Sequence, residues 1–333
     1  MGDLLWGTPA IRAIKKAFPR VGIDLLLQPR WKDLLSGNTY IRQLIPYHSQ
    51  WFRQLFGLLK LRQFHYDHVL IFHANKNFGR VLPWLRCTSI WSHQNIKILP
   101  SLSENQIIQI NKPVHGILRR IAMLEKIKVP ADGTHMDIFL EDKDKADAIS
   151  FLKNNRIASK EFIYMNIGGS SLQKQWPVDK FVSLAKLILK NTSMSIMLGG
   201  GLEATGRISL IEKEIGLERV IRVNHLSLQK NCSLISQARI LISPDSGPMH
   251  IGFALKIPTI ALFWSTDSTG TIPRNPLNGP DHCGPLKIDE SLSVVLYGNF
   301  FNGTKKEDNP EYPFLSPILV SEVWEKVLDF LKI

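Results

Sequence analysis

The stretch RILISPDSGPMHIGFALKIPTIALFW, from Arg239 to Trp264, indicates how the second half of this chain folds. An apolar run leads into a short polar turn, an apolar helical segment follows, and a second apolar run closes the stretch. This order predicts one strand–helix–strand unit of a parallel sheet. The polar turn carries Asp245, Ser246 and Gly247, and His250 follows one helical turn later.

The polar turn of this unit predicts a site for an anion. Open parallel sheets bind ligands beyond the carboxyl ends of their strands, where helix N-termini offer unpaired N–H groups and partial positive charge. The alternative is a plain helix cap, closed by Asp245 or Ser246 and eased by Gly247. His250 favours the site, because its ring would point back toward the same crevice, although a core histidine also fits that position.

Length and composition limit the class of protein. A chain of 333 residues with 44% hydrophobic residues predicts two domains with sizeable cores. It contains no apolar run of the ~18 residues needed to span a bilayer and no signal-peptide pattern at its start, so we expect a cytoplasmic protein. The three cysteines, at positions 87, 232 and 283, have no metal-ligand spacing and are too few for a disulfide framework. We therefore expect no metal site.

The charge balance favours an anionic partner. Lys and Arg number 41 against 29 Asp and Glu, a net charge of +12. This surplus is typical of proteins that meet nucleic acid, phosphorylated lipid or nucleotide sugars. The basic residues are scattered through helical segments, with no arginine-rich tail, zinc-finger spacing or RNA-recognition signature, so we expect no nucleic-acid partner. The alternative is that much of this charge only aids solubility.

The hydrophobic patterns divide the chain into two α/β halves. The first is predicted to contain helices over 4–18, 51–63 and 114–127, strands over 23–27 and 69–72, and a charged helix over 142–155. The second alternates strands and helices from residue 162 to Trp264, as in a complete doubly wound parallel sheet. We predict domains over 1–156 and 157–317. A C-terminal segment over 318–333, with a helix over 321–331, is expected to pack back on the first domain.

Three further polar connections of the second half point to the same edge of the sheet. The stretch NIGGSSLQKQWP, residues 166–177, offers N–H, hydroxyl and ammonium donors to phosphate, from Ser170 and Lys174 among others. The stretch LGGGLEATGR, residues 198–207, places Glu203 at the start of a helix, and TDSTG follows at 266–270. Each has an ordinary alternative: a flexible loop for the first and a favourable helix dipole for Glu203. Four such connections together favour a ligand crevice.

Four motifs resemble, in order, those of glycosyltransferase family 9, the ADP-heptose:lipopolysaccharide heptosyltransferases. They are MGDLLWGTPAIRAIKKAFP at the start, GSSLQKQWP, GGGLEATGR, and SPDSGPMHIGFAL near the end. The resemblance covers nearly the whole chain. It implies an α/β GT-B fold of two Rossmann-like domains facing a cleft, with the acceptor side in the first domain and the nucleotide sugar in the second.

The resemblance also implies roles for individual residues. Asp3 matches the family's catalytic carboxylate, and Glu203 matches the acidic residue associated with the adenosine ribose. The remaining donor-binding positions are Ser170 and Lys174, for the diphosphate, and the group Asp245, Ser246, Gly247 and His250. Gly169 stands where some members carry a hydroxyl. The stretch 264–267, Trp-Ser-Thr-Asp, departs from the more usual Gly-Pro-Thr-Asp and leaves the exact donor sugar open.

The implied reaction is inverting transfer from an ADP-sugar, without a cofactor or metal. A carboxylate deprotonates an acceptor hydroxyl, which attacks the anomeric carbon opposite the departing ADP. The acceptor would be the anionic core of lipopolysaccharide, reached by peripheral contact with the cytoplasmic face of the inner membrane. Alternatives are a transferase using another nucleotide sugar, a non-catalytic relative, and a nicotinamide-dependent oxidoreductase. The last is disfavoured, because no G-x-G-x-x-G follows a strand with an acidic residue about 20 positions on.

The start of the chain carries a separate expectation. A parallel α/β domain normally begins with a strand that leads into its first functional turn, and relatives carry an apolar strand before their Gly-Asp motif. Here Met1-Gly2-Asp3 is already that turn. We therefore expect Met1 to be an internal methionine or the gene to be truncated, with a natural form longer by ~10–15 residues. The 333-residue form is expected to be poorly stable and weakly active or inactive.

Overall fold

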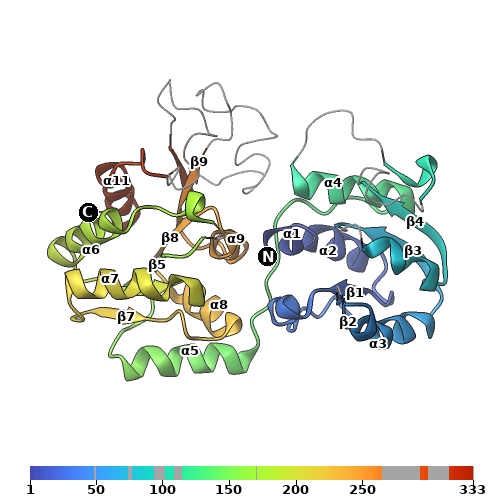
Figure 1. Ribbon diagram of the computed structural model, residues 1–333, viewed down its shortest axis with the longest axis horizontal. Coiled ribbons are helices and arrows are strands. Elements are labelled where there is room, and N and C mark those ends of the chain that lie inside the picture. The colour runs from blue at the N-terminus through green and yellow to red at the C-terminus, as the bar shows by residue number, and fades with distance from the viewer. Residues whose placement is uncertain are drawn as a thin grey trace. The chain divides into compact units, whose positions relative to one another are not determined.

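The computed structural model describes residues 1–48, 50–73, 77–93, 102–108, 115–169, 171–264, 293–298 and 315–332. Its contacts separate two compact units, an N-terminal unit that ends at Phe139 and a C-terminal unit that begins at Leu140 (Figure 1). Helix α5 (Asp142–Asn154) packs on α8 (Leu228–Gln237) and so belongs to the C-terminal unit. The division therefore falls before α5, whereas the sequence analysis placed this helix in the first domain.

The C-terminal unit is built on a six-stranded parallel sheet with the strand order β10-β9-β8-β5-β6-β7. Ile163 of β5 lies opposite Ile196 of β6 on one side and Ile240 of β8 on the other. After α5, the helices and strands of this unit are β5 (Phe162–Asn166), α6 (Val178–Asn191), β6 (Ser195–Gly199), α7 (Thr205–Ile215), β7 (Val220–Arg222), α8, β8 (Ile240–Pro244), α9 (Gly247–Ala254), β9 (Thr259–Trp264), β10 (Ser293–Gly298) and α11 (Val320–Leu331).

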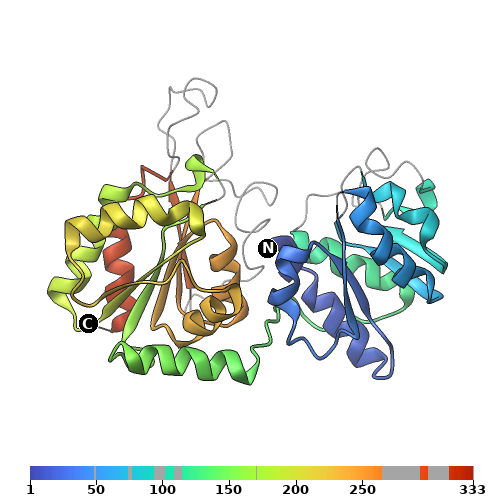
Figure 2. The same ribbon diagram turned by 60° about the horizontal axis from the view of Figure 1, so that its bottom comes forward.

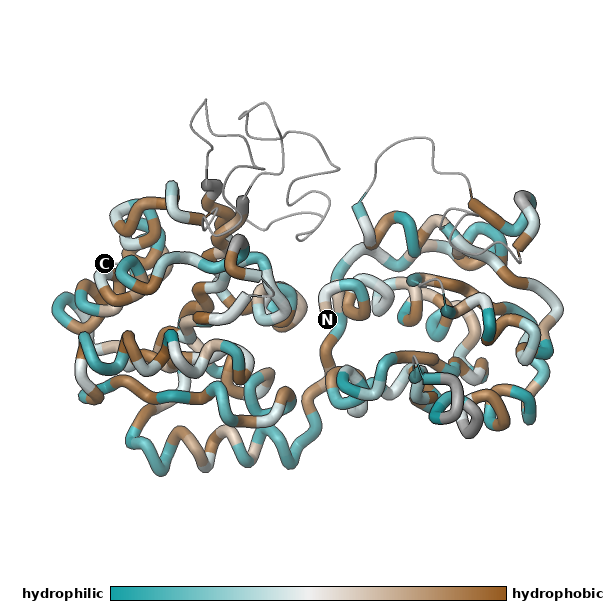
Figure 3. Tube along the Cα trace, viewed as in Figure 1, coloured by the Kyte–Doolittle hydropathy of each residue, from teal (hydrophilic) through white to brown (hydrophobic). Residues whose placement is uncertain are grey.

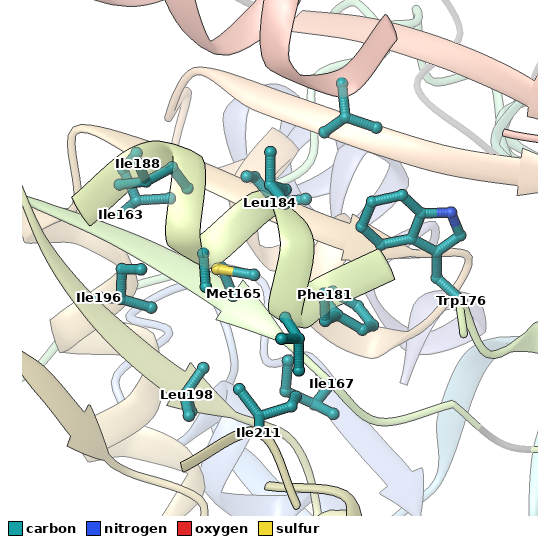
Figure 4. Close-up of a cluster of buried hydrophobic side chains, with 14 of the residues drawn as sticks. Ile163, Met165, Ile167, Trp176, Phe181, Leu184, Ile188, Ile196, Leu198 and Ile211 are labelled. Carbon is teal, nitrogen blue, oxygen red and sulfur yellow. The ribbon is translucent and has the colours of Figure 1, made fainter. Parts of the chain in front are cut away.

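Helices cover both faces of this sheet, which explains why its strands are apolar runs rather than alternating patterns. Strands β5, β6 and β8 are buried along their whole length. Ile163 and Met165 point toward the core under α6, α7 and α11 (Figure 4). Tyr164 lies on the opposite face, where its hydroxyl donates to Asn231 of α8 at 2.7 Å. Figure 2 shows the two helix layers on either side of the strands, and in Figure 3 the outer helix α5 alternates between polar and apolar turns.

The last helix, α11, packs within the C-terminal unit, on α6, β9 and β10. Val323 and Val327 of its apolar face are fully buried in the same core as Trp176. The indole Nε1 of Trp176 donates to the carbonyl of Ile318 at 3.2 Å, just before the helix begins. The sequence analysis had expected this segment to pack on the first domain. The structure differs from this expectation, because the apolar face of α11 is buried in the core beneath α6.

The N-terminal unit contains two separate parallel sheets, each of two strands: β1 pairs with β2, and β3 with β4. Its helices and strands are α1 (Gly2–Leu5), α2 (Thr8–Ala17), β1 (Asp24–Leu27), β2 (Gln43–Pro46), α3 (Trp51–Arg62), β3 (Tyr66–Ile71), β4 (Cys87–Ser92) and α4 (Gly116–Ala122), with short 3-10 turns between them. Within the described ranges no backbone ladder joins the two sheets. Asp24 of β1 and Tyr66 of β3 are linked by a side-chain hydrogen bond of 2.8 Å.

The first predicted helix divides into two. Helix α1 ends at Leu5, whose carbonyl accepts a hydrogen bond from the Thr8 hydroxyl at 2.7 Å, and α2 begins there with Pro9 in its first turn. Arg12 of α2 then binds the segment that leads out of this unit, through the Asp132 carboxylate at 2.8 Å and the His135 carbonyl at 2.7 Å. In the part of the chain that the structure describes, no helix is long and apolar enough to cross a membrane.

Candidate active site

The strand order of the C-terminal unit sets the position of a ligand site. From β5 the chain proceeds through β6 to β7 on one side of the sheet, then returns to β8 on the other side of β5. The junction between β5 and β8 is therefore a topological switch point, and ligands of such sheets bind beyond the carboxyl ends of the strands there. The loops 167–177 and 245–246, which carry most of the predicted donor residues, follow these two strands.

Asn166, the last residue of β5, fixes the two strand ends to each other. Its amide Nδ2 donates to the Ser246 hydroxyl at 2.7 Å and to the Ser243 hydroxyl at 3.1 Å. The side chain is buried, at 1% exposure. Sequence reasoning gave this residue no role, although it opens the stretch NIGGSS. The signal was its polar amide at the end of an otherwise apolar strand.

The start of α9 is not closed by a side chain. Ser246 is the N-cap residue, but its hydroxyl makes no capping bond; it lies against Asn166 and, at 3.2 Å, Ser243. The capping alternative is therefore wrong, and the N–H groups of the first turn of α9 remain available for an anion. His250 lies in this first turn and is buried, at 6% exposure.

Helix α9 packs closely on the sheet at Gly252. A Cβ atom added there would lie 2.4 Å from Cδ2 of Leu241 and 2.6 Å from Oγ1 of Thr259. Such distances require the absence of a side chain, so Gly252 sets how near α9 approaches β8 and β9. The N-terminus of α9 is thus held at the switch point by packing as well as by the chain.

Lys174 and Asp245 form an ion pair across the switch point. The Lys174 ammonium lies 2.6 Å from Oδ2 of Asp245, and the two side chains are 33% and 11% exposed. An ammonium carries three N–H donors, and this contact uses one. The other two are available to phosphate oxygens beside the start of α9. Ser170, the other predicted diphosphate ligand, lies outside the described residues, as do the positions 265–267.

The loop that carries Lys174 is tied to α7. The Arg207 guanidinium donates to the Gln175 side chain and to the Trp176 carbonyl, and Nε2 of Gln175 donates to the Gly169 carbonyl at 3.3 Å. A Cβ atom at Gly169 would lie 2.8 Å from the Lys174 carbonyl oxygen. The loop is therefore folded too tightly for the hydroxyl residue that some relatives carry at this position.

Glu203 lies where the loop after β6 meets the loop after β5. The backbone of Gly200 has a φ of +139° and passes close to Gly168, such that a Cβ on Gly200 would lie 3.0 Å from the Gly168 nitrogen. The exposed Glu203 side chain folds over this contact: Oε1 lies 3.0 Å from a Cβ built on Gly168. The ends of β8, β5 and β6 therefore bring Asp245, Lys174 and Glu203 to one edge of the sheet.

Asp3 lies in the N-terminal unit, in the four-residue helix α1, with its side chain 54% exposed. Its Oδ1 accepts a hydrogen bond of 3.0 Å from Nη2 of Arg120, on α4. Burial lowers the pKa of Arg120, and the Asp3 carboxylate offsets part of this effect. Sequence reasoning identified Asp3 by its motif but not Arg120, because the two lie far apart in the chain and no motif marks α4. No cluster of three or more His, Cys, Asp or Glu side chains suited to a metal ion occurs among the described residues.

The profile of glycosyltransferase family 9 (heptosyltransferase) matches residues 86–280, more than half of the chain. The chain belongs to glycosyltransferase family 9. This membership rules out the nicotinamide-dependent oxidoreductase that the sequence analysis left as an alternative.

Several individual heptosyltransferases and glycosyl transferases are similar to this chain over most or all of its length. Lipopolysaccharide heptosyltransferase 1 of Campylobacter coli is 24% identical over 288 residues, which are 80% of this chain and 82% of the relative. A family 9 glycosyl transferase of Veillonella parvula superposes with a TM-score of 0.80 at 19% identity, covering 100% of this chain and 95% of the other. Heptosyltransferase WaaC of Escherichia coli, solved with ADP, gives 0.74 at 18% identity, covering 99% and 97%. The predicted GT-B fold class is confirmed.

Proposed function

We propose that this family 9 protein is an inverting glycosyltransferase that moves a heptose or a related sugar from an ADP-sugar to the anionic core of lipopolysaccharide. The observation that carries the proposal is the Lys174–Asp245 pair beside the open start of α9, at the switch point of the sheet. The names of the relatives, and the ADP bound to one of them, support a nucleotide-sugar donor.

The donor's diphosphate would lie between Lys174 and the first turn of α9. Both supply positive charge and N–H donors to oxygens on which negative charge grows as the sugar leaves. Asp245 limits the movement of the Lys174 ammonium by its contact of 2.6 Å. On the neighbouring strand end, the Glu203 carboxylate would accept hydrogen bonds from the hydroxyls of a ribose. These contacts suit a nucleoside diphosphate sugar better than a single phosphate.

Asp3 would act as the general base of the transfer. Its half-exposed carboxylate accepts the proton of an acceptor hydroxyl, and the hydroxyl oxygen forms a bond to the anomeric carbon. The bond between that carbon and the ADP oxygen breaks on the opposite face, so the configuration inverts. The leaving ADP keeps the electron pair and is stabilised by Lys174 and α9.

The net charge of +12 suits an anionic acceptor at a membrane surface. We propose peripheral contact with the cytoplasmic face of the inner membrane, where the growing lipopolysaccharide core would be reached.

The variant Lys174→Ala tests this proposal. Its control is Lys186→Ala, which also removes a lysine, from the exposed side of α6. Removing a charge-assisted hydrogen bond to the diphosphate costs about 1.5–3 kcal/mol, so kcat/KM for ADP-heptose should fall roughly 10- to 150-fold. Lys186→Ala should leave it within about two-fold. Unchanged kinetics in Lys174→Ala would contradict the donor site. Transfer from a UDP-sugar but not from ADP-heptose would establish the alternative donor, and ADP binding without transfer from any donor would establish a non-catalytic relative.

A further inference from the structure

Arg120 is a deeply buried charge that the proposed reaction leaves without a role. Its side chain is 3% exposed, whereas the Asp3 carboxylate that it holds is 54% exposed. Its Nη1 donates to the Gly116 carbonyl at 2.7 Å, and its Nε is buried without a hydrogen-bond partner among the described residues. Within the described chain, the ion pair of this guanidinium is with Asp3.

Such an arrangement is a poor way to stabilise a fold. Burying a guanidinium costs several kcal/mol, and a half-exposed carboxylate that makes one hydrogen bond repays little of that cost. A buried charge with an orphan N–H group is retained more readily where it serves the site that its partner occupies.

Helix α1 cannot hold the Asp3 side chain rigidly by itself. It has four residues, which is about one turn, and isolated turns of helix are unstable without tertiary contacts. The second tether comes from α4. The Arg120 guanidinium lies 5.4 Å from the ring centroid of Trp6, just beyond the end of α1, on the face of the indole.

The start of α4 is itself fixed against Trp6. His115 is the N-cap of α4, and its Nδ1 accepts a hydrogen bond from the Ile117 N–H at 3.0 Å. The His115 ring packs edge-on against Trp6, with 5.5 Å between centroids. A Cβ atom on Gly116 would lie 2.5 Å from Cε3 of Trp6, so no other residue permits this approach. Arg120 therefore projects toward α1 from a helix whose beginning is locked to the same segment.

We propose that Arg120 is a positioning residue that fixes Asp3 through Oδ1 and leaves Oδ2 to accept the proton of the acceptor hydroxyl. The inference rests on the proposed role of Asp3 as the base. Since a misplacement of about 1 Å can cost roughly 100-fold in rate, Arg120 acts on kcat through the orientation of the carboxylate. In this role Arg120 acts on the carboxylate and not on the binding of the donor.

The experiment compares Arg120→Met and Arg120→Lys with Arg119→Met, which removes the same charge from the neighbouring position of α4. Arg120→Met should lower kcat roughly 100-fold while KM for donor and acceptor stays within about three-fold. Arg120→Lys, which retains a cation, should recover at least ten-fold of that loss. Arg119→Met should keep kcat within about three-fold. Activities are expressed per folded molecule, from the amplitude of the near-UV circular dichroism signal.

A double variant separates this inference from the proposed function. Asp3→Asn should abolish most activity, and Arg120→Met added to it should cause no further loss in kcat, because the two residues act as one unit. Losses that multiply, or a kcat per folded molecule in Arg120→Met equal to that of the wild type, would overturn the positioning role. Full activity in Asp3→Asn would instead overturn the proposed base. If Arg120→Met does not fold, Arg120→Lys is compared with Arg120→Gln. A kcat of Arg120→Lys that is no higher than that of Arg120→Gln would then overturn the positioning role.

Discussion

The two units of this protein use different means to reach a folded state. The C-terminal unit has one six-stranded sheet and one large apolar core that contacts β5, β6, β8 and β9 together. The N-terminal unit has two two-stranded sheets and smaller, separate apolar clusters. Every cation–π contact found among the described residues also lies in the N-terminal unit.

This difference predicts an order of unfolding. Apolar area that is buried continuously contributes in proportion to its size, whereas exposed ion pairs and cation–π contacts contribute about 1 kcal/mol or less each. We therefore expect the N-terminal unit to unfold first, at lower urea concentration. Hydrogen exchange with mass spectrometry resolves peptides from each unit and measures this order.

The largest effect is expected at Trp176, in the core of the C-terminal unit. Its side chain is fully buried and contacts Phe181 edge-on, with 5.0 Å between ring centroids. Trp176→Ala should reduce the free energy of unfolding of this unit by about 4 kcal/mol, because it leaves a large cavity and removes the indole hydrogen bond to the Ile318 carbonyl, which keeps only its bond from Lys180. Leu217→Ala, at a 69% exposed side chain, is the control and should cost under about 0.5 kcal/mol. An equal loss of hydrogen-exchange protection in both units of Trp176→Ala would contradict the expectation that the two units unfold independently.

A smaller effect is expected at Arg12, which holds the N-terminal unit together by charge. Its side chain is 9% exposed and bonds both Asp132 and Asp137. Arg12→Met should destabilise this unit by about 3 kcal/mol, because the carboxylates lose their buried partner. Lys16→Met removes a cation from the same Asp132, but at a 60% exposed side chain, and should cost under about 0.5 kcal/mol. Similar losses of stability in the two variants would show that burial does not determine how much the ion pairs of Arg12 stabilise this unit.

The smallest effect concerns pH and His93, also in the N-terminal unit. Burial, with help from the nearby Arg120 charge, lowers the pKa of His93 from 6.5 to about 4. Between these values the unfolded chain binds a proton that the folded unit does not. The contribution of neutral His93 to the stability of the unit is therefore complete above pH 6.5 and is lost as the pH falls toward 4. Between pH 6.5 and pH 4, urea titrations should show a loss of unfolding free energy that is about 3 kcal/mol smaller in His93→Gln than in the wild type. His65→Gln, at an exposed side chain, is the control, and an equal flattening in both would contradict the assignment.

The sequence predicted the C-terminal unit well because its signals are local. From β5 to β9 each strand is an apolar run and each helix start carries a polar turn, so β5 and α9 were found with their neighbours. Strand β10, which follows the predicted sheet, was missed. Strands β2 and β4 were missed, since Gln43–Pro46 is short and ends in proline, and half of the residues of Cys87–Ser92 are polar. Both are half-exposed strands whose pairing depends on contacts distant in sequence.

The candidate site shows the same limit. Lys174, Glu203 and Asp245 sit in loops with a recognisable composition, and topology alone brings their strand ends to one edge. Arg120 could not be found in this way, because its relation to Asp3 is a long-range contact between two helices. Sequence patterns identify residues at strand ends; they do not identify the side chains that orient them.

The outer edges of β1 and β3 have a consequence for the behaviour of the protein in concentrated solution. Within the described chain, neither edge is joined to a further strand by a backbone ladder. Such edges present N–H and C=O groups on which a strand of another molecule can form, and this is a common route to aggregation. In the two-stranded sheets of the N-terminal unit every strand is an edge strand, whereas in the six-stranded sheet only the two outermost strands are. Self-association of this protein should begin from a strand edge of this unit and should limit the concentration at which it stays monodisperse.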